Sequence, residues 1–412
     1  MTSLELEQSL QKYARLIVRF GVAVSKGQTV HITAPIERVD IVRLVAAEAY
    51  DAGAKAVEIV WQDDDLTRIR YEHAQPQAFE SFPEWKKQKF DDLVAEGAAF
   101  ITIYAPNPGL LEGIDGDKVA ADNKLTSTAL QDYRMAMQKG LVRRTMVSAP
   151  TAAWAKAVFP DKSVDDAIDA LWQQIFQATR IDTADPLAAW TDHVGRIQDR
   201  LALLNDAQFK ELRYRAPGTE LTVELPQNHV WIGGGLNDPA GVFHMPNMPT
   251  EEVFTAPKRD GVHGTVRSTK PLNYNGSVID NFSITFEHGR IVHFDAETGR
   301  DALARLIDTD EGSDYLGEVA LVPDNSPISN SGITFKNTLF DENASCHLAI
   351  GMAYPFCIEG GVQMSPAELT QRGLNVSLVH EDFMVGSREL DIDGVRPSGE
   401  VVPLFRQGNW VE

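Results

Sequence analysis

The hydrophobic pattern of the N-terminal half alternates between helix-like and strand-like segments. Apolar residues recur at steps of three and four from Leu6 to Phe20, which predicts an amphipathic helix. The β-branched and apolar runs typical of strands lie at residues 28–35, 56–61, 98–106 and 143–150, and helical patterns lie between and after them. Strands alternating with helices favour an open, mostly parallel sheet covered by helices. We therefore expect an N-terminal α/β domain over residues 1–208.

The pattern changes near Phe209 to a period of two around glycine-containing turns. The segment LRYRAPGTELTVELP (212–226) alternates apolar and polar residues as a hairpin does, and FSITFEHGRIVHFDAETG (282–299) predicts a second hairpin. Residues 229–257 are rich in Gly, Pro and Asn, which indicates loops, and one helix is predicted near 301–308. We expect residues 209–412 to form a strand-dominated α+β domain. Loops this long in a compact domain are usually functional.

Two further strands carry acids and histidines. EVALVP (318–323) predicts a strand with Glu318 at its start, on the face of Ala320 and Val322. A carboxylate that enters the interior there needs a cation or several donors. In NVSLVHEDF (375–383), His380 and Asp382 are two residues apart and share one face, whereas Glu381 between them is expected to face solvent.

Charge and cysteine content narrow the class of protein. Lys plus Arg number 38 against 59 Asp plus Glu, a formal charge of −21, which disfavours nucleic acid and anionic membranes as partners. Two cysteines allow neither a disulfide framework nor a cysteine-built zinc site. The N-terminus lacks the apolar core of a signal peptide, and no run approaches the roughly 20 apolar residues of a membrane span. We expect a cytoplasmic protein.

The stretch from Glu318 to Asp382 concentrates the candidate chemistry. Its polar residues of interest are Glu318, Asp341, Glu342, His347, Tyr354, His380 and Asp382. Carboxylate and imidazole are the ligands expected for a catalytic divalent metal, and more than three such groups favour two metals. The spacing is not a sharp pattern such as HExxH, so surface acids and structural histidines remain the alternative. Cys346, beside His347, is expected to be a structural thiol because strand neighbours face opposite sides.

Four segments resemble one known family. NMPTEEVFTAP (247–257), GEVALVPDNSPIS (317–329), TLFDENASCHLAIGMAY (338–354) and HEDFMVGS (380–387) are similar to segments of the M29 family of metallo-aminopeptidases, the thermophilic aminopeptidase T group. The resemblance covers essentially the whole chain. It implies a homodimer and two divalent metal ions per chain, with zinc, cobalt and magnesium all open as the native metal. The metal ligands that it implies are Glu252, Glu318, Glu342, His347, His380 and Asp382, and the implied catalytic tyrosine is Tyr354.

The function that this resemblance implies is a metal-dependent aminopeptidase that releases N-terminal amino acids from peptides by a metal-activated water. Glu318 is our candidate for a bridging ligand, and Tyr354 for a hydrogen-bond donor to the oxyanion. One member of each acidic pair, Asp341–Glu342 and Glu251–Glu252, is expected to cap a helix or to be solvated. Two alternatives remain open. One is a metallohydrolase for a non-peptide ester or amide bond, and the other is a non-catalytic protein that binds metal or peptide.

Overall fold

The structure, a computed structural model, describes residues 2–274 and 277–411. The chain forms two compact units. Unit 1 consists of Met1–Thr191, Gly235–Pro249 and Thr334–Leu339, and unit 2 consists of Asp192–Gly234, Thr250–Ile333 and Phe340–Glu412. Helix α9 (Pro186–Ala207) passes from the first unit into the second. The domain boundary expected between residues 208 and 209 stays a prediction.

Unit 1 contains the predicted parallel sheet. Its strands are β1 (Thr29–Pro35), β2 (Ala56–Gln62), β3 (Ala99–Tyr104) and β4 (Arg144–Ser148), and every neighbouring pair in the order β2-β1-β3-β4 is parallel. Because parallel strands need a crossover connection, helices follow each strand. They are α2 (Val39–Asp51), α3 (Asp64–His73), α4 (Glu84–Ala95), α5 (Gly116–Ala129) and α6 (Gln131–Gln138).

The ends of unit 1 are helical as well. The N-terminal helix α1 (Ser3–Leu16) continues as a π-helical turn through Gly21, close to the range that the apolar spacing predicts. Helices α7 (Ala152–Val158) and α8 (Val164–Ala178) follow the last parallel strand. A short two-stranded sheet of β8 (Leu236–Asn237) and β9 (Phe243–His244) completes the unit. The α/β prediction for the N-terminal half is confirmed.

Unit 2 is built on two antiparallel sheets. The smaller sheet has the order β17-β16-β15-β10-β7. Its strands are β7 (Ile232–Gly233), β10 (Val253–Thr255), β15 (Leu316–Leu321), β16 (His347–Gly351) and β17 (His380–Met384). Short helices α11 (Pro327–Asn330), α12 (Thr338–Asp341) and α13 (Pro366–Gln371) lie in its connections.

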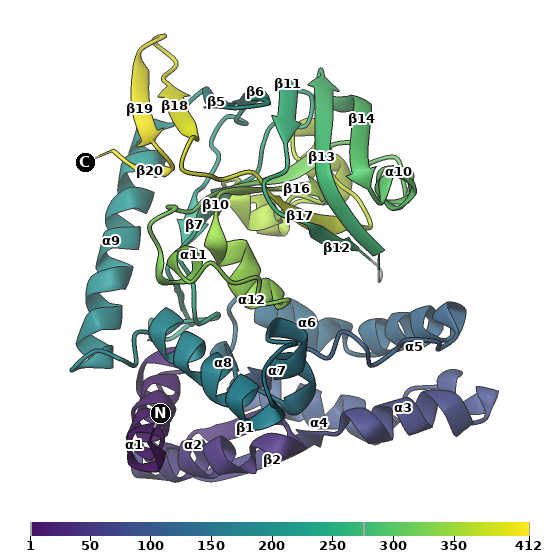
Figure 1. Ribbon diagram of the computed structural model, residues 1–412, viewed down its shortest axis with the longest axis vertical. Coiled ribbons are helices and arrows are strands. Elements are labelled where there is room, and N and C mark those ends of the chain that lie inside the picture. The colour runs from purple at the N-terminus through teal and green to yellow at the C-terminus, as the bar shows by residue number, and fades with distance from the viewer. Residues whose placement is uncertain (1, 275–276, 412) are drawn as a thin grey trace. The chain divides into compact units, whose positions relative to one another are not determined.

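The larger sheet has the order β12-β13-β11-β6-β5-β18-β19-β20, with β14 paired to β13. Its strands are β5 (Glu211–Ala216), β6 (Thr219–Glu224), β11 (Val262–Arg267), β12 (Leu272–Tyr274), β13 (Ser277–Glu287), β14 (Arg290–Thr298), β18 (Asp391–Val395), β19 (Val401–Arg406) and β20 (Asn409–Trp410). Both predicted hairpins are present, and helix α10 (Arg300–Ile307) packs on β13 and β14 (Figure 1). The prediction of a strand-dominated α+β region is confirmed.

One face of the small sheet belongs to the core of unit 2. Val319, Leu348, Ile350 and Phe383 are buried in a continuous apolar cluster that also contains residues of β13, such as Phe282. Burying such side chains removes apolar surface from water, and each Å² buried stabilises the fold by roughly 25 cal/mol. The alternate residues of these strands face the other way, because side chains alternate along a strand. The opposite face of the small sheet is therefore available for polar residues.

A β-bulge at Gly317 decides which residues of β15 reach that opposite face. Leu316 lies opposite Ile350, but Glu318 lies opposite Ala349, so the register shifts by one residue between them. Leu316 and Glu318 therefore face opposite sides of the sheet although they are two residues apart. A Cβ atom at position 317 would lie 2.2 Å from the carbonyl oxygen of Met352, which only glycine avoids. The bulge thus places Leu316 in the core and Glu318 on the polar face.

The end of β16 is held by one buried amide. The Asn375 side chain is almost fully buried, at 1% exposure, and its Nδ2 donates to the carbonyl oxygens of Gly312 at 2.7 Å and Gly351 at 2.6 Å. Its Oδ1 accepts from Arg259 Nε at 3.0 Å. These bonds satisfy backbone acceptors that would otherwise be buried without a partner.

We expect Asn375→Ala to lower the free energy of unfolding by about 2–4 kcal/mol, because two buried carbonyl groups lose their donor. Urea denaturation followed by tryptophan fluorescence measures the change. Asn330→Ala is the matched control, because Asn330 is exposed and, among the described residues, its side-chain amide bonds to the Asn325 side chain alone. Its expected effect is within about 0.5 kcal/mol. Equal stability of the two variants would contradict the role given to Asn375.

Candidate metal centre

The predicted ligands lie on neighbouring strands of the small sheet. Glu252 directly precedes β10, Glu318 lies on β15, His347 on β16, and His380 and Asp382 on β17. These strands are consecutive in the sheet order, so residues far apart in the sequence become neighbours in space. The expectation that His380 and Asp382 share one strand face agrees with their positions.

The strand register aligns these residues on the polar face. Glu318 lies opposite Ala349, and Ala349 lies opposite Asp382, while His347 lies opposite Ala320. Residues directly opposite in an antiparallel pair have their side chains on the same face. Two small residues, Ala320 and Ala349, thus lie between the charged ones on this face. Sequence reasoning missed this floor of alanines, although the signal is present in the alternation of EVA (318–320) and HLA (347–349).

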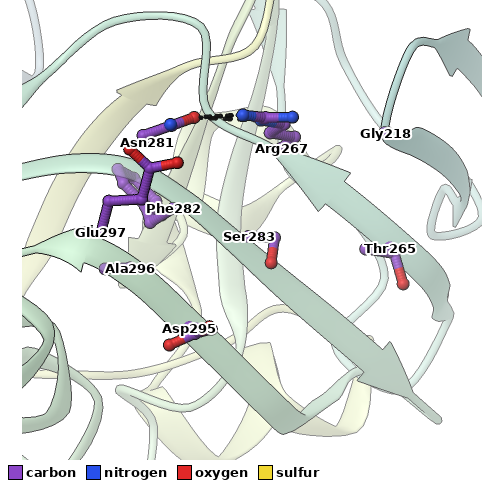
Figure 2. Close-up of a pocket in the computed structure, with 9 residues that line it drawn as sticks. All are labelled: Gly218, Thr265, Arg267, Asn281, Phe282, Ser283, Asp295, Ala296 and Glu297. Carbon is purple, nitrogen blue, oxygen red and sulfur yellow. Dashed lines mark hydrogen bonds between the residues drawn. The ribbon is translucent and has the colours of Figure 1, made fainter.

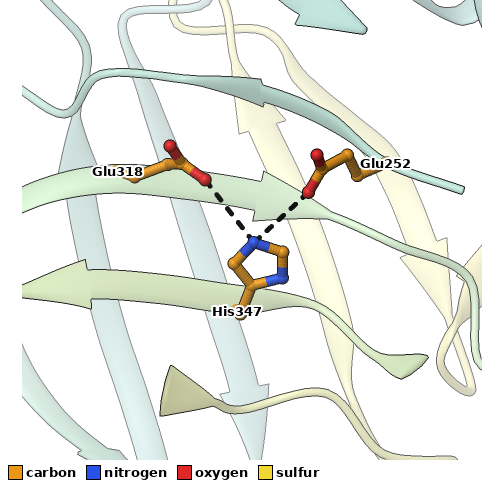
Figure 3. A group of neighbouring side chains, drawn as sticks. All are labelled: Glu252, Glu318 and His347. Carbon is orange, nitrogen blue, oxygen red and sulfur yellow. Dashed lines mark ion pairs between the residues drawn. The ribbon is translucent and has the colours of Figure 1, made fainter. Parts of the chain in front are cut away.

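The side chains form two groups that share Glu318. His347 Nε2 lies 3.4 Å from Glu252 Oε2 and 3.5 Å from Glu318 Oε1, so the two carboxylates approach the imidazole from two sides (Figure 3). His380 Nε2 lies 3.6 Å from Glu318 Oε2 and 3.5 Å from Asp382 Oδ1. In each group, the oxygen and nitrogen atoms that could bind a cation lie within 4.8 Å of one another. The two oxygens of Glu318 therefore face different histidines.

Backbone carbonyl groups orient both imidazole rings. His347 Nδ1 lies 3.2 Å from the carbonyl oxygen of Ser345, and His380 Nδ1 lies 2.7 Å from that of Met352. In each ring the Nδ1–H donates to a carbonyl, which directs Nε2 toward the carboxylates. Histidines that bind metals are usually held in this way by a partner of their second nitrogen.

The electrostatics of the cluster are dominated by its carboxylates. Burial lowers the pKa of His347, but the hydrogen bond with Glu318 and the charges of Asp382 and Glu252 outweigh this effect and raise it to about 10. Burial is likewise outweighed at His380, where Asp382 and Glu318 raise the pKa to about 9. Burial raises the pKa of Glu252 to about 7, and the negative charges of Glu318 and Asp382 contribute. Ionised together, these carboxylates require nearby positive charge.

Glu342 belongs to the same electrostatic group. It lies in the 3₁₀ turn Glu342–Ala344, directly before β16. Burial raises its pKa well above the usual range, and the neighbouring charges of Glu252 and Asp382 add to the shift. The Asn343 amide lies 3.4 Å from one of its oxygens. The structure therefore brings the sixth predicted ligand into the field of the other five.

The carboxylate oxygens and imidazole nitrogens of this cluster are suited to bind a divalent cation. The cluster has four carboxylates, those of Glu252, Glu318, Glu342 and Asp382. Within residues 2–274 and 277–411, no lysine or arginine forms an ion pair with any of them. In the same part of the chain, Asp382 Oδ1 is buried and accepts no hydrogen bond. Carboxylate oxygens and imidazole nitrogens are ligands for zinc and related divalent ions. A bound cation would offset the desolvation of these acids.

Tyr354 reaches the cluster from the connection after β16. Its ring lies 4.7 Å from the His380 ring, measured between centroids. Burial and the charges of Glu318 and Asp382 raise the pKa of its hydroxyl above the ordinary value, so the phenol is protonated at neutral pH. Its hydroxyl forms no hydrogen bond with any residue that the structure describes. A protonated, unengaged phenol beside the cluster is available as a donor.

Other sequence expectations have mixed outcomes. Glu251 is buried and lies 3.5 Å from His193 Nε2, so the expectation of a capping or solvated acid is wrong. Glu381 lies opposite Ile350 on the core side of the sheet and is only partly exposed, so its expected solvated position is also wrong. Cys346 is buried and hydrogen-bonded through Sγ to the backbone of Val322, which confirms the structural thiol.

A cavity of about 360 Å³ lies elsewhere in unit 2, on the larger sheet (Figure 2). Its lining comes from β11, β13, β14 and the turn between β5 and β6, and includes Thr265, Arg267 and Asp295. None of the predicted site residues lines it. The chemistry of the cluster therefore does not extend into this cavity.

Among the described residues, no helix is both long enough and apolar enough to span a membrane.

Comparisons with known proteins agree with the geometry. The sequence model of a family described as thermophilic metalloprotease (M29) matches residues 6–410. The chain is 51% identical over 403 residues to aminopeptidase AmpS of Bacillus subtilis, with 98% of each chain covered. It is 42% identical over 405 residues to aminopeptidase T of Thermus thermophilus, with 98% of this chain and 99% of the relative covered.

A solved structure of a relative has the same fold as this chain. Wild-type AmpT from Thermus thermophilus superposes with a TM-score of 0.92 at 41% identity, over 98% of this chain and 99% of that one. The match spans both units, so the fold is shared over nearly the whole length. A metalloprotease family implies a divalent metal, which the carboxylate and imidazole cluster is suited to bind. The chain belongs to the M29 family of thermophilic metalloproteases.

Proposed function

We propose that this metal-dependent aminopeptidase releases N-terminal amino acids from peptides at a site for two divalent ions. The observation that carries the proposal is the shared position of Glu318, whose two oxygens face His347 and His380 separately. A carboxylate between two ligand groups is suited to bridge two cations. Glu252 and His347 would complete one group, and His380 and Asp382 the other, with Glu342 beside them.

The substrate class follows from the relatives and from the charge of the site. The relatives are named aminopeptidases. The free α-ammonium group of a peptide is a cation, and a site lined by carboxylates attracts it. An internal peptide segment has no such group. A carboxylate that bound ions leave free would therefore favour the N-terminus of a peptide over an internal bond.

The chain's own residues supply orientation and hydrogen bonding for the reaction. Bound divalent ions supply Lewis-acid polarisation of a carbonyl group and a lowered pKa for a water molecule. The carbonyl groups of Ser345 and Met352 hold the two imidazole rings in the orientation that this arrangement needs. The protonated Tyr354 hydroxyl donates a hydrogen bond to the oxygen on which negative charge develops during hydrolysis.

Substitution of the shared carboxylate tests the metal site. We expect Glu318→Gln to lose bound divalent metal and to hydrolyse aminoacyl-nitroanilides at least about 100-fold more slowly, because an amide is a poor replacement for a ligating carboxylate. Metal analysis by mass spectrometry and initial rates measure both effects. Glu381→Gln is the control, because Glu381 faces the other side of the sheet.

Wild-type protein should contain up to two divalent ions per chain and lose activity on chelation. Full activity in protein shown to contain no metal would refute the proposed site. Cleavage of ester or non-peptide amide substrates in preference to aminoacyl-nitroanilides would refute the substrate class while leaving the metal site in place.

Tyr354→Phe tests the oxyanion donor. The change removes one hydroxyl and keeps the ring, so metal content and stability should be unchanged. Loss of one such donor is expected to lower kcat on the order of 10²–10³-fold with a smaller effect on KM. Steady-state kinetics with a leucyl-nitroanilide provide the measurement. Normal turnover in this variant would assign Tyr354 a packing role only.

We also propose that the protein is a homodimer located in the cytoplasm. The motivation for the dimer is the family resemblance. The two cysteines, Cys346 and Cys357, are both free, which is in keeping with a reducing compartment such as the cytoplasm. Static light scattering coupled to gel filtration should give about twice the 45.5 kDa chain mass. A single species at the chain mass, over the concentration range used for kinetics, would exclude the dimer.

A further inference from the structure

The ring of Tyr354 is surrounded by other rings. Phe356 stacks on it with a centroid separation of 5.1 Å and an interplanar angle of 9°, and Phe254 meets it edge-on at 6.2 Å. Phe254 and Phe356 also contact each other, at 6.1 Å and 73°. The three rings and the His380 ring thus form one aromatic cluster at the edge of the metal centre.

This packing is the main restraint on the Tyr354 side chain. Within the described residues its hydroxyl forms no hydrogen bond, so no polar partner holds the phenol in place. A donor to a developing oxyanion must nevertheless be positioned before the reaction, since much of its value depends on preorganisation. The stacked ring of Phe356 restricts rotation about the side-chain bonds of Tyr354. Offset stacking of this kind stabilises a ring pair beyond the burial of its apolar area.

The backbone that carries Phe356 is itself constrained. Tyr354, Pro355 and Phe356 are consecutive, and Pro355 begins a 3₁₀ turn from Pro355 to Cys357. The pyrrolidine ring fixes the backbone angle φ of Pro355. The Cys357 N–H donates to the Tyr354 carbonyl oxygen at 3.0 Å, and Cys357 is buried. Phe254 comes from β10, two residues after Glu252, so the cluster is tied to the ligand strands as well.

We propose that Phe356 is a positioning residue, which acts on hydrolysis through Tyr354 by holding its hydroxyl where the oxyanion forms. This inference rests on the proposed function of Tyr354. Phe356 is partly buried and carries no group that could donate, accept or ligate. We assign its effect on catalysis to Tyr354, the residue on which it stacks.

A double-mutant cycle tests this inference. Phe356→Ala should lower kcat by about 10- to 100-fold, as part of the loss that a missing oxyanion donor causes, with little change in KM. In the Tyr354→Phe background the same substitution should change kcat by less than about 2-fold, since no hydroxyl remains to be positioned. Phe356→Tyr keeps the stacked ring and should restore kcat to within about 2-fold of wild type. Equal losses in both backgrounds would overturn the inference.

Structural readouts separate positioning from simple destabilisation. The crystal structure of metal-loaded Phe356→Ala should show Tyr354 in more than one rotamer, with both histidines and the metal content unchanged. One wild-type rotamer would overturn the inference. If the alanine variant fails to fold, Phe356→Leu fills similar volume without an aromatic face and serves in the same cycle. Phe294→Ala is the matched control, because Phe294 is a partly buried aromatic of unit 2 on β14 and is expected to leave kcat unchanged.

Failure of this inference and failure of the proposed function give different results. If Tyr354→Phe alone retains wild-type kcat, both the donor role of Tyr354 and the positioning role of Phe356 fall, whereas chelator-sensitive hydrolysis still supports the metal site. If Tyr354→Phe is impaired and Phe356→Ala has normal kcat, only the positioning role falls. A rise in KM in both backgrounds would instead indicate direct contact between Phe356 and the substrate, which also overturns the inference.

Discussion

Several carboxylates held near one another out of water are the constraint around which unit 2 is organised. Each acid loses hydration on burial, and each repels the next, so the arrangement is costly unless positive charge compensates it. The two imidazoles lie among these acids, whose negative charges raise the pKa values of both rings. The absence of lysine and arginine pairs within the described residues means that no fixed protein cation competes for the site. The cluster is thus prepared for an exchangeable cation.

The small sheet accommodates this cluster by separating its two faces. One face packs into the main core of unit 2, and the other carries the acids and histidines above a floor of alanines. The separation depends on register, since a shift of one residue would exchange the faces of a strand. The bulge at Gly317 makes such an exchange locally, so that Leu316 enters the core while Glu318 leaves it. A rigid scaffold of strands then sets the spacing of the ligands.

Much of this arrangement could be predicted from the sequence, and the failures have a common physical origin. Strand and helix periodicity predicts the parallel sheet of unit 1, and the family motifs predict the residues that meet on β10, β15, β16 and β17. Alternation along one strand predicts that Glu381 faces solvent, whereas its cross-strand partner Ile350 places it on the core side. The burial of Glu251 does not follow from its neighbours in the sequence, because its partner His193 lies on helix α9, far away along the chain. The stacking of Phe356 on Tyr354 depends likewise on side-chain packing that local patterns do not contain.

The position of β17 at the end of the small sheet has a consequence for exchange kinetics. This strand pairs with β16 and carries His380 and Asp382, whereas Glu252, Glu318 and His347 lie on or next to interior strands. Terminal strands open locally at lower free energy than interior ones. Transient fraying of β17 would withdraw both of its ligands at once and leave the other group assembled. If two cations bind as proposed, they should therefore differ in residence time, with the one beside β17 the faster to equilibrate with the surrounding pool of ions.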